Sequence, residues 1–97
     1  MSRNVFVDLG FSDDEAVELA LRVMIAVRLE QLIRHRQLTA RQAGRQWGVP
    51  EAMVRQLLQS RSTALSLGAL MRLLIAAGVP FDIRRGASPQ DVDVVID

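Results

Sequence analysis

The stretch over residues 38–61 constrains the fold of this chain most, because its capping residues predict where two short helices begin and end. Thr39 with Gln42 three residues later has the pattern of a capping box, which marks a helix start. Gly48 is typical of the residue that ends a helix, and Pro50 is typical of a first helical position. The stretch therefore predicts two short helices joined by a turn of roughly three to four residues.

Apolar residues in this stretch recur at the spacing expected for the inner side of two packed helices. These inner residues are Ala43, Trp47, Val49, Val54, Leu57 and Leu58. The outward positions are mainly basic or carry amide groups, which suit DNA phosphates and base edges. The candidate DNA-binding residues are Thr39, Arg41, Arg45, Glu51, Ala52, Arg55, Gln56, Gln59 and Arg61. Two helices arranged in this way let a protein lay the second one, the recognition helix, in the major groove of DNA.

Charge is unevenly distributed along the chain. Residues 34–61 carry six Arg and a single acid, Glu51, whereas residues 1–18 carry five acids and a single Arg. A basic block over the two short helices predicts contacts with DNA phosphates, although the formal net charge of the whole chain is only +1. Within the block, Arg55 is predicted to read a base edge and Arg61 to contact a phosphate.

Length and composition exclude several classes of protein. A chain of 97 residues predicts one domain, and 49% hydrophobic residues with only 4% aromatic ones predict an aliphatic, mainly helical core. No apolar run approaches the roughly 18–20 residues that span a bilayer, and the acidic N-terminus lacks the basic start of a secretory signal. We therefore expect a cytoplasmic, nucleoid-associated protein with no membrane contact. Because the chain has no Cys and no residue pattern of an active site, we expect no enzyme activity, cofactor or metal.

Capping residues also predict the other two helices. Ser12 and Glu15 form a second capping box, before a long helix that runs to about residue 36. Ser66 is a typical N-cap for a last helix that ends near Gly78.

Alternating apolar residues predict two strands, over residues 79–85 and 91–97, that form a hairpin. Because a lone hairpin is marginal in water, the helices or a second chain should cover it. The fold class is therefore mainly α, a compact helical bundle with a central helix-turn-helix and a short C-terminal strand or hairpin. The predicted parts are an extended lead-in over residues 1–12, a helical domain over 13–78, and the hairpin and tail over 79–97.

The long helix carries more apolar residues than one core stripe uses. The stripe predicted to face the helix-turn-helix consists of Ile25, Leu29, Leu32 and Ile33. The surplus apolar positions are Val17, Leu21, Met24 and Val27. A helix that is apolar over more than half its circumference lies centrally or is shared with a partner. Together with the unpaired edge of strand 79–85, this surplus predicts a twofold homodimer in which C-terminal strands pair.

Residues elsewhere that could carry chemistry have simpler structural explanations. His35, near the end of the long helix, is expected to be solvated or to meet the helix dipole. Trp47 is expected in the core. The strand alternation is expected to place three carboxylates on a solvent face, those of Asp91, Asp93 and Asp97.

The chain resembles the XRE (Cro and phage-repressor-like) helix-turn-helix family and, within it, the HigA-type antitoxins. The resemblance covers about residues 4–85. Its motifs are NVFVDLGF at 4–11, LT at 38–39, Ala43, Gly48-Val49, Val54, Leu57-Leu58 and LSLGALMRLLIAAG at 65–78. It implies a λ-repressor-like fold and a homodimer that represses its own promoter at a pseudo-palindromic operator in double-stranded DNA. It also implies a cognate RelE-like toxin as partner.

Several positions depart from that family's pattern. Ala40 stands where Gln usually touches a phosphate, and Pro50-Glu51-Ala52 stands where Ser, Thr or Asp is usually followed by Gln. Glu51 is expected to repel phosphates unless it accepts a hydrogen bond from a cytosine amino group, and Arg55 to compensate. Two functions stay open: a sequence-specific DNA-binding regulator of the autorepressing antitoxin type, and a non-enzymatic interaction module that has lost DNA binding.

Overall fold

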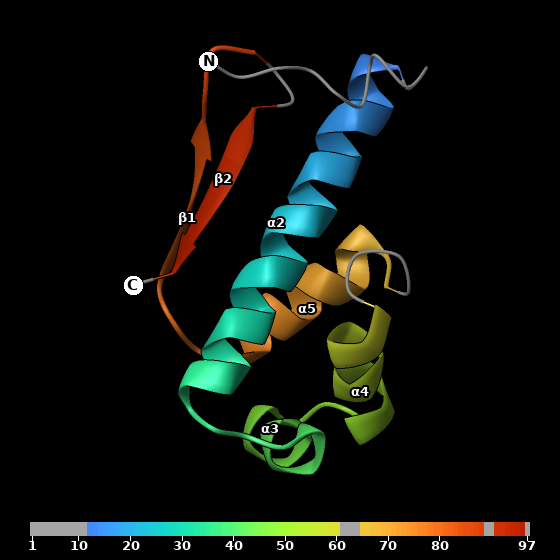
Figure 1. The fold of residues 1–97 in the computed structure, drawn as a ribbon, viewed down its shortest axis with the longest axis vertical. Helices are drawn as coiled ribbons and strands as arrows, with labels where there is room; N and C mark the ends of the chain where they lie inside the picture. The colour runs from blue at the N-terminus through green and yellow to red at the C-terminus, as the bar shows by residue number, and fades with distance from the viewer. Residues whose placement is uncertain (1–11, 61–64, 89–90, 97) are drawn as a thin grey trace.

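The computed structural model describes residues 12–60, 65–88 and 91–96. In these ranges it has four helices followed by a two-stranded antiparallel hairpin, which confirms the predicted mainly α fold. The elements are α2 (Asp13–His35), α3 (Ala40–Trp47), α4 (Glu51–Ser60), α5 (Leu67–Ala76), β1 (Phe81–Arg85) and β2 (Val92–Ile96). Figure 1 shows α3 beyond the C-terminal end of α2, α4 beside the C-terminal half of α2, and the hairpin running alongside α2. The predicted lead-in over residues 1–11 lies outside the described residues.

Helix α2 begins at the predicted capping box and ends at His35, close to the predicted end near residue 36. The Ser12 hydroxyl accepts a hydrogen bond from the Glu15 N–H at 3.2 Å, and the Glu15 carboxylate accepts one from the Ser12 N–H at 3.1 Å. This backbone N–H, followed by the Ser12 hydroxyl, lowers the pKa of Glu15 below its ordinary value. At the other end, Gln37 adopts a left-handed conformation with φ 56°, and the chain then turns into α3.

The core lies where α2, α4 and α5 meet. Its largest fully buried side chains are Ile25, Leu29, Ile33, Val54, Leu57, Leu70, Leu73, Leu74 and Val94. Leu32, which was predicted to face the helix-turn-helix with Ile33, is only partly buried and lies toward the end of β2. Two of the surplus apolar residues, Leu21 and Met24, pack against the core, so part of the predicted surplus is covered within the chain.

The hairpin has the predicted antiparallel pairing with shorter strands than the alternation suggested. Ile83 lies opposite Val94, and Phe81 lies opposite Ile96. Strand β1 begins two residues later than predicted, directly after Pro80, which has no N–H to donate to a strand ladder. The cover that the hairpin needs comes from α2, which contacts β2. Val94 is fully buried, while Ile83 on β1 keeps 46% of its surface exposed.

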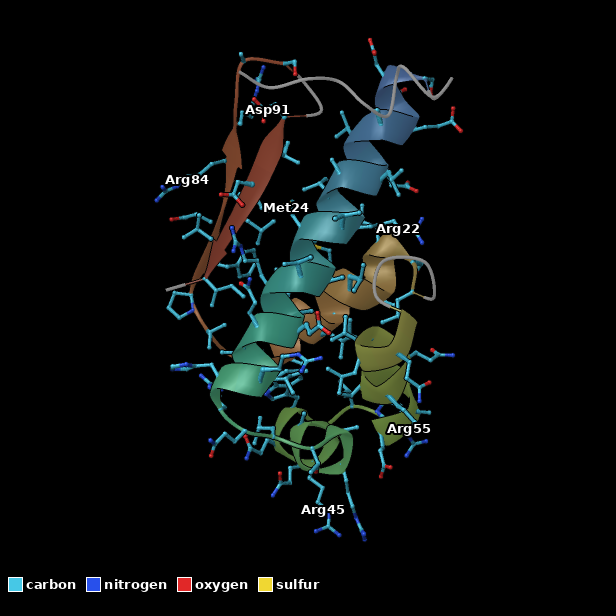
Figure 2. The ribbon with its side chains drawn as sticks, viewed as in Figure 1. Arg22, Met24, Arg45, Arg55, Arg84 and Asp91 are labelled. Carbon is cyan, nitrogen blue, oxygen red and sulfur yellow. The ribbon has the colours of Figure 1, made fainter. Side chains whose placement is uncertain are left out.

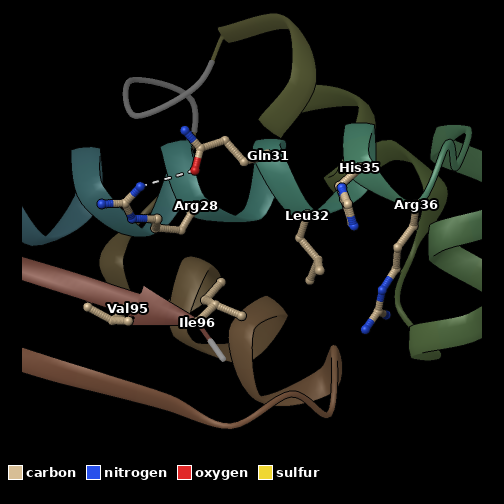
Figure 3. Close-up of a pocket in the computed structure, with 7 residues that line it drawn as sticks. All are labelled: Arg28, Gln31, Leu32, His35, Arg36, Val95 and Ile96. Carbon is tan, nitrogen blue, oxygen red and sulfur yellow. Dashed lines mark hydrogen bonds between the residues drawn. The ribbon is translucent and has the colours of Figure 1, made fainter.

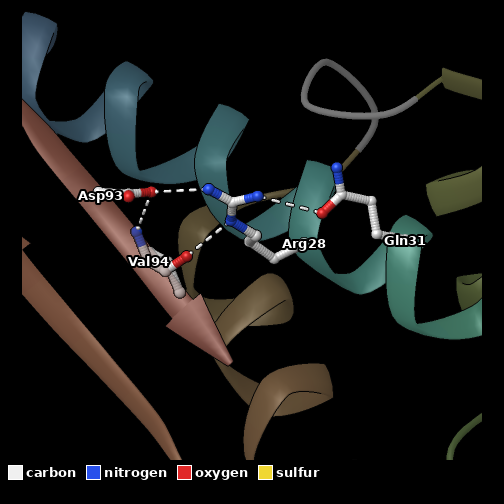
Figure 4. A network of polar contacts seen from close by, with 4 residues as sticks. All are labelled: Arg28, Gln31, Asp93 and Val94. Carbon is white, nitrogen blue, oxygen red and sulfur yellow. Dashed lines mark hydrogen bonds and ion pairs between the residues drawn. The ribbon is translucent and has the colours of Figure 1, made fainter. Parts of the chain in front are cut away.

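A single arginine of α2 holds β2 in place (Figure 4). Arg28 Nε donates to the Val94 carbonyl at 2.8 Å, and Arg28 Nη2 contacts Asp93 Oδ1 at 3.1 Å. The same Asp93 oxygen accepts the Val94 N–H at 2.8 Å. The Asp93 side chain keeps 47% of its surface exposed, in keeping with the predicted solvent face, but it also pairs with Arg28, which the alternation did not predict. The outer edge of β2 needs partners for its backbone groups, and the Asp93 carboxylate and the Arg28 guanidinium supply them.

Candidate nucleic-acid interface

The start and the end of α3 have the predicted geometry. The Thr39 hydroxyl accepts from the Gln42 N–H at 3.1 Å, and the Gln42 side chain accepts from the Thr39 N–H at 2.8 Å. Gly48 ends the helix in the left-handed region with φ 66°, a conformation that glycine adopts at little cost. The Thr39 hydroxyl proton can still be donated, so this cap can also contact a phosphate.

Helices α3 and α4 cross at Gly44. A Cβ atom at Gly44 would lie 3.0 Å from the Val49 carbonyl oxygen and 3.3 Å from the Glu51 nitrogen, so only glycine fits there without a shift of the chain. The predicted inner side is confirmed: Ala43, Trp47, Val49, Val54 and Leu57 are buried, and Leu58 is partly buried. The α3–α4 corner therefore presents α4 at a fixed angle to the rest of the molecule.

The outer side of the corner carries the candidate DNA-binding residues. The exposed ones are Thr39, Arg41, Arg45, Ala52, Arg55, Gln56 and Gln59, whereas Glu51 is partly buried. Figure 2 shows Arg45 projecting from α3 and Arg55 from α4, both away from the core. Arg61 lies outside the described residues, so its phosphate contact stays a prediction.

One acid lies among these cations. The Glu51 carboxylate forms an ion pair with the Arg55 guanidinium, one turn along α4. Glu51 also lines a small hollow of about 170 Å³ between α3 and α4, together with Arg41 and Arg45. The ion pair joins two residues that the sequence analysis treated separately, although their i, i+4 spacing is the usual signal of such a pair.

Sequence reasoning missed Arg22 of α2. Its Nε and Nη2 atoms donate to the Leu65 carbonyl at 3.2 and 3.0 Å. Leu65 is buried just before α5, so Arg22 anchors the backbone at the point where the chain enters α5. No local sequence pattern predicts this contact, because Arg22 and Leu65 lie 43 positions apart.

A second candidate site is a groove of about 840 Å³ between the C-terminal half of α2 and the end of β2 (Figure 3). Its wall is apolar, and its other lining residues have cationic or polar side chains. The lining residues are Arg28, Gln31, Leu32, His35, Arg36, Val95 and Ile96. His35 is exposed near the helix end, as expected, and no group of metal-ligating side chains occurs within the described ranges. Such a groove suits an apolar segment that carries a carboxylate.

Comparison with known families agrees with this geometry. The chain belongs to a family of helix-turn-helix domains, whose profile matches residues 5–85. No curated protein and no solved structure is significantly similar to the chain. Within the described residues, no helix is long and apolar enough to cross a membrane. The family match and the exposed basic corner mark the chain as a DNA-binding regulator of the helix-turn-helix class.

Proposed function

We propose that this protein is a sequence-specific, non-enzymatic transcriptional repressor that lays α4 in the major groove of its operator. The observation that carries the proposal is the α3–α4 corner, whose inner side is buried while Arg41, Arg45 and Arg55 on its outer side are exposed. Exposed guanidinium groups beside a fixed helix supply both phosphate contacts and base-edge contacts.

A homodimer follows from this mode of binding, because twofold proteins present two recognition helices about 34 Å apart to pseudo-palindromic sites. Among the described residues, only β2 pairs with β1. The backbone groups of Val94 bond Asp93 and Arg28, so the Ile83–Val94 pair is of the non-hydrogen-bonded kind. The Ile83 N–H and carbonyl therefore point away from β2, toward the outer edge of β1. We propose that this edge, with the exposed Ile83 side chain, pairs with β1 of a second copy.

We further propose an autorepressing antitoxin of the HigA type, acting at the nucleoid in the cytoplasm. The XRE-like motifs support this role, and so does the charge distribution on α2. Its first turns expose Asp13, Asp14, Glu15 and Glu18. These acids lie at the opposite end of the molecule from α3 (Figure 1), so a basic RelE-like toxin could bind them and leave the recognition helix uncovered.

DNA binding is tested by fluorescence anisotropy with a duplex from the protein's own upstream region and a scrambled duplex. We expect specific binding whose affinity falls with salt at a slope of about −0.9 per phosphate neutralised. Arg55→Ala should cost about 1–3 kcal/mol and relax the preference at one base pair. Arg72→Ala, an exposed arginine of α5 outside both the α3–α4 corner and β1, is the matched control and should change neither.

A folded protein that does not distinguish the two duplexes at about 50 mM salt would overturn the proposal. The antitoxin role has its own test, in which the product of the adjacent gene is expressed alone and together with this protein. Growth arrest that this protein relieves supports the role. An adjacent product that is harmless, or whose toxicity persists, rejects it.

The alternative function, a protein-interaction module without DNA affinity, is favoured by one observation, the groove between α2 and β2. His35 and Arg36 are exposed at its rim, and Leu32 and Ile96 form its wall. An interaction module would bind an acidic and apolar peptide there and would show no operator preference. The same anisotropy experiment therefore separates the two functions.

A further inference from the structure

Glu51 occupies an unusual place on the proposed DNA-binding surface. It is the first residue of α4 and the single acid within residues 34–61. Its side chain keeps 41% of its surface exposed, and that of Arg55 keeps 51%, so both can reach a ligand while they remain paired. The pair offers a hydrogen-bond acceptor beside a hydrogen-bond donor on one exposed face of the recognition helix.

We propose that Glu51 and Arg55 act as one reading unit for a C·G base pair. In the major groove, such a pair presents the cytosine N4 amino group, a donor, beside the guanine O6 and N7 acceptors. The Glu51 carboxylate accepts from the amino group, and Arg55 donates to guanine through N–H groups that the ion pair leaves unused. A T·A pair presents a thymine O4 acceptor in place of the amino group and therefore faces Glu51 with a repulsive contact.

The same ion pair weakens binding to DNA of the wrong sequence. Non-specific affinity comes almost entirely from neutralised phosphates. Glu51 cancels the charge of Arg55, and it also lies beside Arg41 and Arg45 in the hollow between α3 and α4. On a non-operator duplex the carboxylate repels phosphates and gains no cytosine contact in return. Glu51 is thus a specificity-determining residue. It lowers the affinity for most DNA sequences but not for those that present a C·G pair at its position.

This inference rests on the proposed DNA-binding function, and its test is a base-substitution scan of the operator with the wild type, Glu51→Ala and Glu51→Gln. The wild type should lose roughly 5- to 150-fold in affinity when one C·G pair becomes T·A. Glu51→Ala should lose that preference, whereas Glu51→Gln should keep part of it, because the amide oxygen still accepts from the cytosine amino group. Both variants lack the negative charge and should bind the scrambled duplex more tightly than the wild type does. Arg55→Ala should abolish the preference at the same base pair.

Glu18→Ala is the matched control, because it removes one exposed acid from α2, far from the α3–α4 corner. It should leave both the base preference and the affinity for the scrambled duplex unchanged. If the Glu51 variants gain equally on operator and scrambled DNA and keep every base preference, Glu51 is only an electrostatic penalty and the inference is wrong. If the wild type binds no DNA specifically, both the proposed function and this inference are wrong. The two failures are distinguishable, because in the preceding case the wild type still binds its operator specifically.

Discussion

Two regions of this molecule, the α3–α4 corner and the C-terminal hairpin, are held by contacts of different range along the sequence. The α3–α4 corner is built from neighbours in sequence: a capping box between Thr39 and Gln42, and a close crossing at Gly44. The hairpin, in contrast, is tied to α2 by Arg28, whose partners Asp93 and Val94 lie 65 and 66 residues away. Local signals are thus enough to shape the α3–α4 corner, whereas the position of the hairpin depends on contacts between distant residues, the hydrogen bonds of Arg28 and the burial of Val94 in the core.

This difference predicts which substitutions damage each region. The corner depends on apolar volume and on close approach, so truncated or added carbon atoms should disturb it most. The hairpin depends on polar contacts at the edge of β2, so the loss of a guanidinium should loosen it and leave the corner unchanged. Substitutions that destabilise the corner without loosening the hairpin, or the reverse, test this difference directly.

The largest effect is expected from Leu57→Ala in the corner. Leu57 of α4 is fully buried in the core, so truncation loses apolar burial and leaves a cavity. We expect the free energy of unfolding to fall by about 2–5 kcal/mol, measured by urea denaturation with the fluorescence of the sole Trp, Trp47, as the signal. The exposed neighbour Gln56→Ala should change it by less than about 0.5 kcal/mol. Similar losses for both would show that α4 is not anchored through its inner side.

Two helical glycines provide the next test. Gly44→Ala places a methyl group 3.0 Å from the Val49 carbonyl oxygen, which should push α4 away from α3 and cost about 1–3 kcal/mol. Gly68 lies in α5 with its nearest neighbour atom, Ser66 Oγ, at 4.0 Å. Gly68→Ala should therefore stabilise the protein by roughly 0.5–1 kcal/mol, the usual gain in helix propensity. Thermal denaturation of both variants gives the comparison, and equal shifts would contradict the close crossing.

The features that the sequence predicted are those with short-range signals. Thr39, Gly48 and Ser66 were identified as caps because each acts on residues within one turn, and all three cap helices in the structure, with Gly48 at the left-handed end of α3. The inner residues of the corner followed from helical periodicity for the same reason. The Glu51–Arg55 pair also has a short-range signal, the i, i+4 spacing of opposite charges in a helix.

The features that the sequence did not predict depend on contacts between distant residues. Arg28 and Asp93 are charges whose partners no local pattern identifies. Strand alternation predicted the exposure of Asp93 but could not show that a cation on a neighbouring helix pairs with it. Leu32 packs against the core but also lines the groove beside β2, and the stripe rule could not predict this because it does not show which element covers each face of α2. The hydrogen bond from Arg22 to the Leu65 carbonyl is likewise a contact between distant residues that no local pattern predicts.

Arg28→Met tests the long-range side of the comparison. Methionine retains an apolar stem but removes the hydrogen bonds to the Val94 carbonyl and to Asp93. Since the ion pair is partly exposed, we expect a loss of only about 1–2 kcal/mol. Hydrogen exchange should quicken at the amides of β1 and β2 and stay unchanged in α3 and α4. Arg72→Met, on an exposed position of α5, is the control. Faster exchange throughout the chain would show that the hairpin and the corner are not independent.

The smallest effect concerns the N-terminal cap of α2, a short-range device outside the corner. The Ser12 N–H, and after it the Ser12 hydroxyl, lower the pKa of Glu15, so the folded state favours its carboxylate. Glu15 therefore adds stability above its unfolded pKa of about 4.5, and this contribution is lost as the pH falls through the lower folded value.

The melting temperature of Glu15→Gln, compared with that of the wild type across this range, measures the contribution. The wild type should have a slightly higher melting temperature than the variant at neutral pH, and this difference should shrink as the solution becomes acidic. In a Ser12→Ala background the hydroxyl is absent and the backbone N–H remains. The pH-dependent part of the difference in melting temperature should therefore decrease without vanishing. A melting-temperature difference that stays constant with pH would mean that the capping box acts by geometry alone, because a neutral glutamine side chain also accepts from the Ser12 N–H and its backbone N–H still donates to the Ser12 hydroxyl.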